Sequence, residues 1–84
     1  MNKFFCSNGH VYNNLKELHA GLLTMSDITF KSHVTDVKND FADWLVQNGF
    51  HDLAKDLRKY HSRALMAYKI GQYIRGMKKD TGTR

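Results

Sequence analysis

The sequence predicts a mainly α-helical domain in which a short N-terminal β-hairpin is followed by three or four helices, the last of them long. Three observations carry this prediction. Apolar residues recur every three or four positions from Leu15 onward, no proline interrupts them, and an Asn-Gly pair near the start lies between two apolar runs. The 84 residues, 42% of them hydrophobic, fit one small domain with a modest core.

The Asn8-Gly9 pair predicts the turn of the hairpin, because Asn-Gly tolerates the positive φ angles of a two-residue type I′ turn. The strands are expected at roughly Lys3–Ser7 and His10–Tyr12, in the register that pairs Phe5 with Tyr12. A lone two-stranded hairpin is marginal in water, so one face must pack on helices.

The first helix is predicted at roughly Leu15–Thr24. Asn14 and Glu17 form a capping box, in which the Asn side chain accepts a free backbone N–H and the Glu side chain reaches back. Leucines at spacings of three and four then give one buried face.

The second helix is expected to begin at Ser26-Asp27. The Ser oxygen can accept a free backbone N–H, and the helix dipole favours the negative charge of Asp in the first turn. Its apolar residues share one stripe of a helical wheel as far as Leu45, although Thr35-Asp36 offers a cap and a break midway. Asn48-Gly49 ends the run as a C-terminal cap should.

The last helix is predicted to run unbroken from Asp52 to about Met77. Residues 1–79 are predicted to form one domain, and residues 80–84 a flexible basic tail. Plotted at about 100° per residue, this helix shows two apolar stripes. The first, predicted to face the core, comprises Leu53, Leu57, Tyr60, Ala64, Ala67 and Gly71. The second, predicted to be a contact surface for a partner, comprises Met66, Ile70, Tyr73 and Met77.

The stretch HVTDVKNDFADWL, residues 33–45, concentrates acids, a histidine and the only tryptophan. Phe41 and Trp44 are interpreted as apolar anchors, and His33 as a core histidine bonded to a backbone carbonyl or an acid. His33, Asp36 and Asp40 have helical spacings that a metal could use, but no second cluster of ligands matches them, so no metal is expected.

Asp40 is the residue of this stretch that packing does not explain. At the edge of the apolar stripe, it is expected to pair with a basic residue of the last helix such as Arg63, or with a loop N–H. Asn39 and Asp43 are expected to face away from the core.

The chain shows no catalytic pattern. Cys6 and His10 flank the predicted turn, but a small apolar residue on a hairpin face explains the cysteine more simply. The glycines are too dispersed for a phosphate-binding loop. The prediction is therefore a protein that is not an enzyme and has no cofactor.

The central run Phe30, His33-Val34, Lys38–Ala42 and Trp44, followed by Leu53-Ala54 and Leu57, resembles a small domain of unknown function found widely in archaeal proteins. That family has an "HVN…KNDFA.W" core and an "LA..L" helix, and the match covers most of residues 3–63. This chain has Thr35 where the family tends to have Asn, and it departs again at residues 47–50. The resemblance supports the fold and implies no activity.

Positive charge gathers toward the C-terminus, where residues 51–84 hold nine Lys and Arg against three Asp. Nucleic acid is one partner that such a segment can bind. The predicted contacts for it are Lys55, Lys59, Arg63, Lys69, Arg75, Lys78 and Lys79. The simpler interpretation is a solvated helix face with a basic tail.

The leading functional hypothesis is a protein-interaction module, which self-associates or binds a partner through the C-terminal helix, with nucleic-acid binding as the alternative. The single cysteine, together with the lack of a signal-peptide region and of a long apolar run, predicts a soluble cytoplasmic protein, and a membrane role is not expected.

Overall fold

The computed structural model describes residues 2–82, with side chains for residues 2–77. The described chain forms two strands and five helices, which confirms a mainly α fold with an N-terminal hairpin and a long C-terminal helix. The elements are β1 (Phe4–Phe5), β2 (Val11–Tyr12), α1 (Leu15–Thr24), α2 (Asp27–His33), α3 (Asp40–Gln47), α4 (His51–Leu57) and α5 (Arg63–Gly82).

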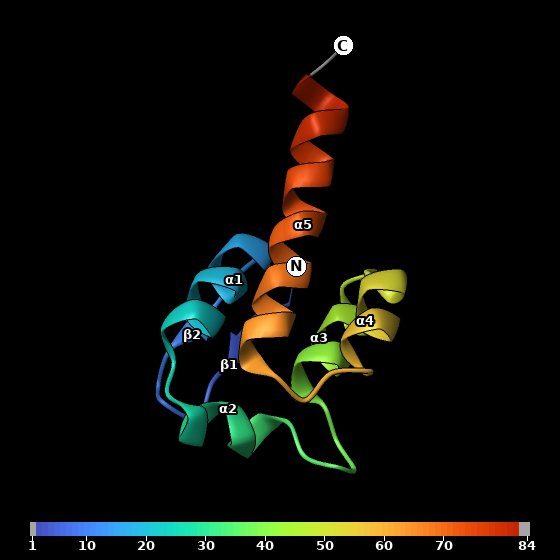
Figure 1. Ribbon diagram of the computed structural model, residues 1–84. Coiled ribbons are helices and arrows are strands. Elements are labelled where there is room, and N and C mark those ends of the chain that lie inside the picture. Colours follow the sequence, from blue (N-terminus) through green and yellow to red (C-terminus); the bar gives the residue numbers. More distant parts are fainter. Residues whose placement is uncertain (1, 83–84) are drawn as a thin grey trace.

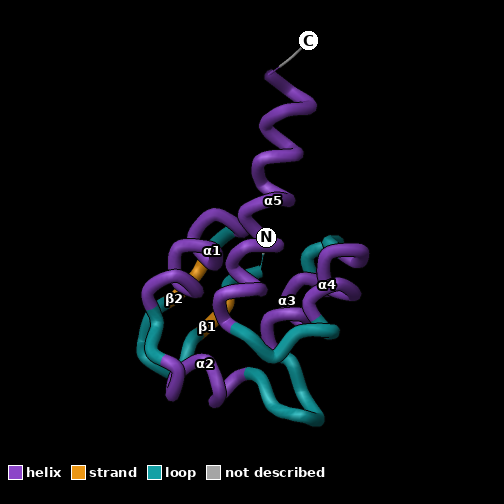
Figure 2. The backbone as a smooth tube through the Cα atoms, viewed as in Figure 1, coloured by secondary structure: helices purple, strands orange, loops and turns teal. Residues whose placement is uncertain are grey.

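The elements are arranged around the first half of α5. Both α1 and α4 contact α5, α3 packs against α4, and β2 lies against α1. Figure 1 shows the second half of α5 projecting beyond the other helices, and Figure 2 shows short loops joining the rest. No helix within residues 2–82 is both long and apolar enough to cross a membrane.

The hairpin exists, but the predicted register is wrong by one residue. Phe4, not Phe5, pairs with Tyr12. The turn is longer than predicted, because the Cys6 N–H donates to the His10 carbonyl at 2.9 Å and the Gly9 N–H donates to the Cys6 carbonyl at 3.0 Å. Gly9 has φ +91°, which fits a three-residue loop that ends in a left-handed residue. Phe4 and Tyr12 are consequently buried, while Phe5 is exposed.

Local capping signals are confirmed at the start of α1 and at the end of α3. The Asn14 side chain accepts the Glu17 N–H at 2.9 Å, and the Glu17 carboxylate accepts the Asn13 N–H at 2.8 Å. After α3, the Gly49 N–H donates to the Val46 carbonyl and the Phe50 N–H to the Leu45 carbonyl. This pair of bonds, with Gly49 at φ +86°, forms a Schellman cap.

The predicted second helix is two helices, α2 and α3, because polar side chains close the loop between them. The Thr35 hydroxyl accepts the N–H groups of Val37 and Lys38, each at 3.2 Å. The Asn39 side chain then caps α3 by accepting the Ala42 N–H at 3.0 Å, and its amide donates to the Leu57 carbonyl. The break at Thr35 is thus confirmed, whereas the prediction that Asn39 faces away is wrong, since it is buried.

The predicted unbroken last helix is also two helices, separated by residues 58–62. Ser62 provides the signal that the sequence analysis missed, because its hydroxyl accepts the Leu65 N–H at 3.2 Å and its carbonyl accepts the Met66 N–H. The break resets the rotational phase of the helix. The predicted core stripe is confirmed at Leu53, Leu57, Ala67 and Gly71, which are buried, whereas the predicted contact stripe does not correspond to an exposed face of α5.

Two residues of the predicted contact stripe, Met66 and Ile70, are fully buried, so their assignment to a surface is wrong. Ala64, predicted to face the core, is exposed. The other two residues of the predicted contact stripe, Tyr73 and Met77, are 37% and 48% exposed.

One continuous core joins all seven elements. Its fully buried side chains with the largest volumes are Phe41, Leu18, Leu22, Leu45, Leu57, Met66 and Ile70. The backbone of residues 80–82 belongs to α5, while residues 83–84 lie outside the described part of the chain, so the flexible tail stays a prediction.

Gly21 lets α1 approach the hairpin, because a Cβ placed there would overlap the Tyr12 ring. We expect Gly21→Ala to lower the free energy of unfolding by about 1–3 kcal/mol, measured by urea denaturation, since overpacking outweighs the gain in helix propensity. Gly76→Ala is the control, because no atom lies within 4 Å of its added Cβ and alanine is the better helix former there. Equal effects of the two substitutions would contradict the close contact at Gly21.

Candidate functional site

The His33 side chain links three segments of the chain. His33 is the last residue of α2, and its Nδ1 lies 2.9 Å from Oδ2 of Asp40, the first residue of α3. Its Nε2 accepts the Ser7 N–H of the hairpin loop at 3.0 Å. Because Nε2 acts as an acceptor, the ring proton is on Nδ1 and is donated to Asp40. The expected core histidine bonded to an acid is confirmed.

Aromatic rings surround this link. The His33 ring lies 5.1 Å from that of Phe4 and 5.4 Å from that of Phe41, between centroids. Trp44 is buried, and its Nε1–H donates to the Asn2 carbonyl at 2.8 Å. These contacts tie the hairpin to α3, so the arrangement is structural.

The predicted Asp40–Arg63 pair is not formed. Asp40 accepts from His33 and, at 3.4 Å, from Lys38 Nζ. Arg63 instead donates to the Leu22 carbonyl at 2.7 Å and to Asp27 Oδ1 at 3.3 Å. Among side chains of residues 2–77, no group of three or more His, Cys, Asp or Glu is placed to hold a metal ion.

Asp40→Ala would leave the Nδ1–H of a largely buried histidine without its acceptor. We expect the free energy of unfolding to fall by about 1–3 kcal/mol in urea denaturation, and Asp40→Asn to lose less because its amide oxygen can still accept. Asp43→Ala is the matched control, because Asp43 pairs with Arg58 where both side chains are about half exposed, and such pairs contribute only about 0–1 kcal/mol. An unchanged stability for Asp40→Ala would contradict the proposed role.

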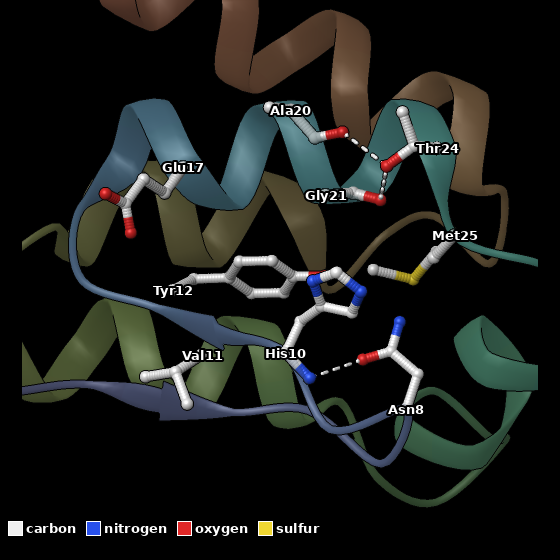
Figure 3. A pocket seen from close by; sticks show the side chains of 9 residues that line it. All are labelled: Asn8, His10, Val11, Tyr12, Glu17, Ala20, Gly21, Thr24 and Met25. Atoms are coloured by element: carbon white, nitrogen blue, oxygen red, sulfur yellow. Dashed lines mark hydrogen bonds between the residues drawn. The ribbon is translucent and has the colours of Figure 1, made fainter.

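A cleft of about 540 Å³ lies between the hairpin and α1 (Figure 3). The Tyr12 ring crosses it toward Gly21, with the His10 ring stacked alongside at 6.5 Å between centroids. Burial raises the pKa of the Tyr12 hydroxyl above its usual value, and the neighbouring Cys6 thiol raises this pKa further. Cys6 is buried beside Tyr12, so it lacks the exposed, electropositive surroundings of a reactive thiol. At neutral pH the Tyr12 phenol in this cleft is therefore protonated.

The raised pKa of Tyr12 has a consequence for stability. The folded protein holds the phenolic proton more tightly than the unfolded chain, so the free energy of unfolding must fall as pH rises above the unfolded value of about 10. We expect Tyr12→Phe to reduce this fall, measured by urea denaturation between about pH 9 and pH 11. Tyr68→Phe, at an exposed position, should leave it unchanged. Identical pH profiles for Tyr12→Phe and the parent would contradict this account.

Three of the predicted nucleic-acid contacts have partners within the described part of the chain. Arg63 pairs with Asp27, Lys59 with Asp56 at 3.8 Å, and Lys69 Nζ lies 5.9 Å from the centre of the Tyr60 ring. Lys55 is exposed on α4, and Arg75 is exposed on α5. The side chains of Lys78 and Lys79 lie outside the described part of the chain.

Two surfaces of α5 are apolar and partly exposed. The first is the projecting stripe, which we define as Tyr73, Ile74 and Met77, on the side of α5 that carries the buried Ile70; Ile74 is partly buried against the core, and Tyr73 and Met77 are 37% and 48% exposed. The second is a groove of about 300 Å³ where α5 packs on α1, with Leu23 and Tyr68 more than half exposed at its edges. Two of the three residues of the first surface, Tyr73 and Met77, were predicted from the sequence. The groove was not, because a groove between two helices has no signature in either helix alone.

Comparison of the chain with protein-family models, curated proteins and solved structures finds no match in any of them. The resemblance to an archaeal domain therefore stays a prediction.

Proposed function

We propose that the protein is a non-enzymatic interaction module that self-associates through the projecting stripe of α5. The observation that carries this is the continuation of the core-facing side of α5 beyond the core. α5 has 20 residues, or about 30 Å of helix, and Figure 1 shows its second half standing clear of the other helices. An apolar stripe on such a helix is typical of one that packs on another chain.

A second copy of this chain suits the stripe. Tyr73 contacts Phe50 edge to face, with 5.7 Å between ring centres, so the stripe joins the body of the domain through an aromatic pair. Two projecting helices in antiparallel arrangement would bring the same residues together about a two-fold axis. The area is small, so the dimer should be weak and concentration-dependent.

Charge gives this proposal a distinctive salt dependence. Each copy carries a formal charge of +5, so repulsion opposes pairing and added salt should strengthen it. Nucleic-acid binding has the opposite dependence, because phosphate contacts weaken steeply as salt rises. We rank that alternative second, since the described cations are partly neutralised by their own neighbours. A cytoplasmic location is part of the proposal and rests on the single cysteine.

Light scattering over a range of concentrations, at about 50 and 500 mM salt, tests this proposal. We expect the mass to rise toward two chains with concentration, and more so at high salt. Tyr73→Lys should restore a mass of one chain without unfolding the domain, because Tyr73 is already partly exposed.

Tyr68→Lys is the matched control, because it adds the same charge about 140° around the helix from Tyr73. Loss of association in both variants would move the interface away from the stripe. A wild-type mass of one chain under all conditions would reject self-association.

A further inference from the structure

The groove between α1 and α5 differs from the projecting stripe in place and in chemistry. Leu23 of α1 and Tyr68 of α5 stand at its edges with 58% and 56% of their surface exposed. Ala64 and Ala67 line it as small residues, which keeps the space between the two helices open. An apolar trough between packed helices is the geometry into which a further amphipathic helix can dock.

Arg75 places a cationic group at one end of this groove, with the His19 imidazole beside it. A Cβ added at Gly71 would lie 3.0 Å from His19 Nε2 and 3.7 Å from Arg75 Nη1, so both groups lie over the same position of α5. Arg63 also lines the groove but is bound to Asp27 and the Leu22 carbonyl. No Asp or Glu is among the lining residues, which leaves the groove positive and apolar together.

The occupant is a different protein and not a second copy. The acidic helices of this chain, α3 and α4, already use their apolar residues in its own core, where Phe41, Leu45, Leu53 and Leu57 are buried. Docking either helix into the groove of another copy would require unfolding of the first.

We propose that this groove binds an acidic amphipathic helix of a partner protein. An aliphatic side chain of the partner fits between Leu23 and Tyr68, and a carboxylate one turn away meets Arg75 beside His19. The proposal goes beyond self-association, because Tyr73 and Tyr68 lie on different sides of α5.

The test is a titration of the uniformly ¹⁵N-labelled full chain with three synthetic peptides of about 15 residues, four turns of helix. The first carries a leucine stripe flanked by Glu, the second replaces Glu with Gln, and the third replaces Leu with Ser. We expect the first peptide to bind at least about tenfold more tightly than either of the others, because only it supplies both charge and apolar contact. Amide shifts should centre on Leu23, Tyr68 and Gly71.

Substitutions at exposed positions separate the groove from the rest of the surface. Arg75→Gln and Tyr68→Ser should each lower the affinity for the Glu peptide about tenfold. Lys16→Gln removes the same charge elsewhere on the surface, and Leu65→Ser removes an exposed apolar side chain from α5 outside the groove. Both controls should bind as the wild type does, and the unperturbed amide spectra report whether each variant is folded.

Three results would overturn the proposal: no binding up to about 1 mM peptide, equal binding of the Glu and Gln peptides, or shifts centred on Tyr73 instead of the groove. Repeating the titration in Tyr73→Lys keeps this result independent of self-association, because that variant removes the projecting stripe and leaves the groove intact. Groove binding that persists in a chain of single mass would support this proposal even if self-association fails.

Discussion

The hydrogen bonds of His33 are the interaction on which the N-terminal half of the structure depends. One ring nitrogen is bonded to Asp40 of α3 and the other to the backbone of Ser7 in the hairpin loop. The hairpin has only two residues in each strand, which is too few to be stable alone. Its stability therefore comes from this link, from Phe4, which packs against the rings of His33 and Phe41, and from Tyr12, which packs against Gly21 of α1.

Arg63 has a comparable role in the other half. The last turn of α1 holds no basic residue, and the guanidinium of Arg63 provides that charge by donating to the Leu22 carbonyl. The same group reaches Asp27 at the start of α2. One side chain at the beginning of α5 thus joins the end of α1 to the start of α2. The buried packing of Met66 and Ile70 then holds the first half of α5 against the rest of the domain.

Interactions between residues close in sequence could be predicted, whereas those across a break could not. The caps at Asn14 and Gly49 are formed by residues a few positions apart in the sequence, and both were predicted correctly. The partner of Asp40 was missed because a continuous helix would hold His33 about 10 Å away, seven residues at 1.5 Å each. The loop closed by Thr35 and Asn39 brings them to 2.9 Å. Similarly, the hairpin register depended on whether the turn had two or three residues, which Asn8-Gly9 alone does not determine.

The break at residues 58–62 had the largest effect on the functional interpretation. The prediction of one unbroken helix through these residues placed Met66 and Ile70 on the surface and Ala64 in the core. In the structure Met66 and Ile70 are buried and Ala64 is exposed. The chain still leaves apolar surface on two sides of α5, but for different reasons. Tyr73 and Met77 continue the core face to the point where α5 leaves the body of the domain, whereas Tyr68 lies on the outer side, where α1 leaves a groove. The projecting half of α5 therefore exposes one surface, because it extends past the other helices. The packed half provides another, because its contact with α1 leaves a groove.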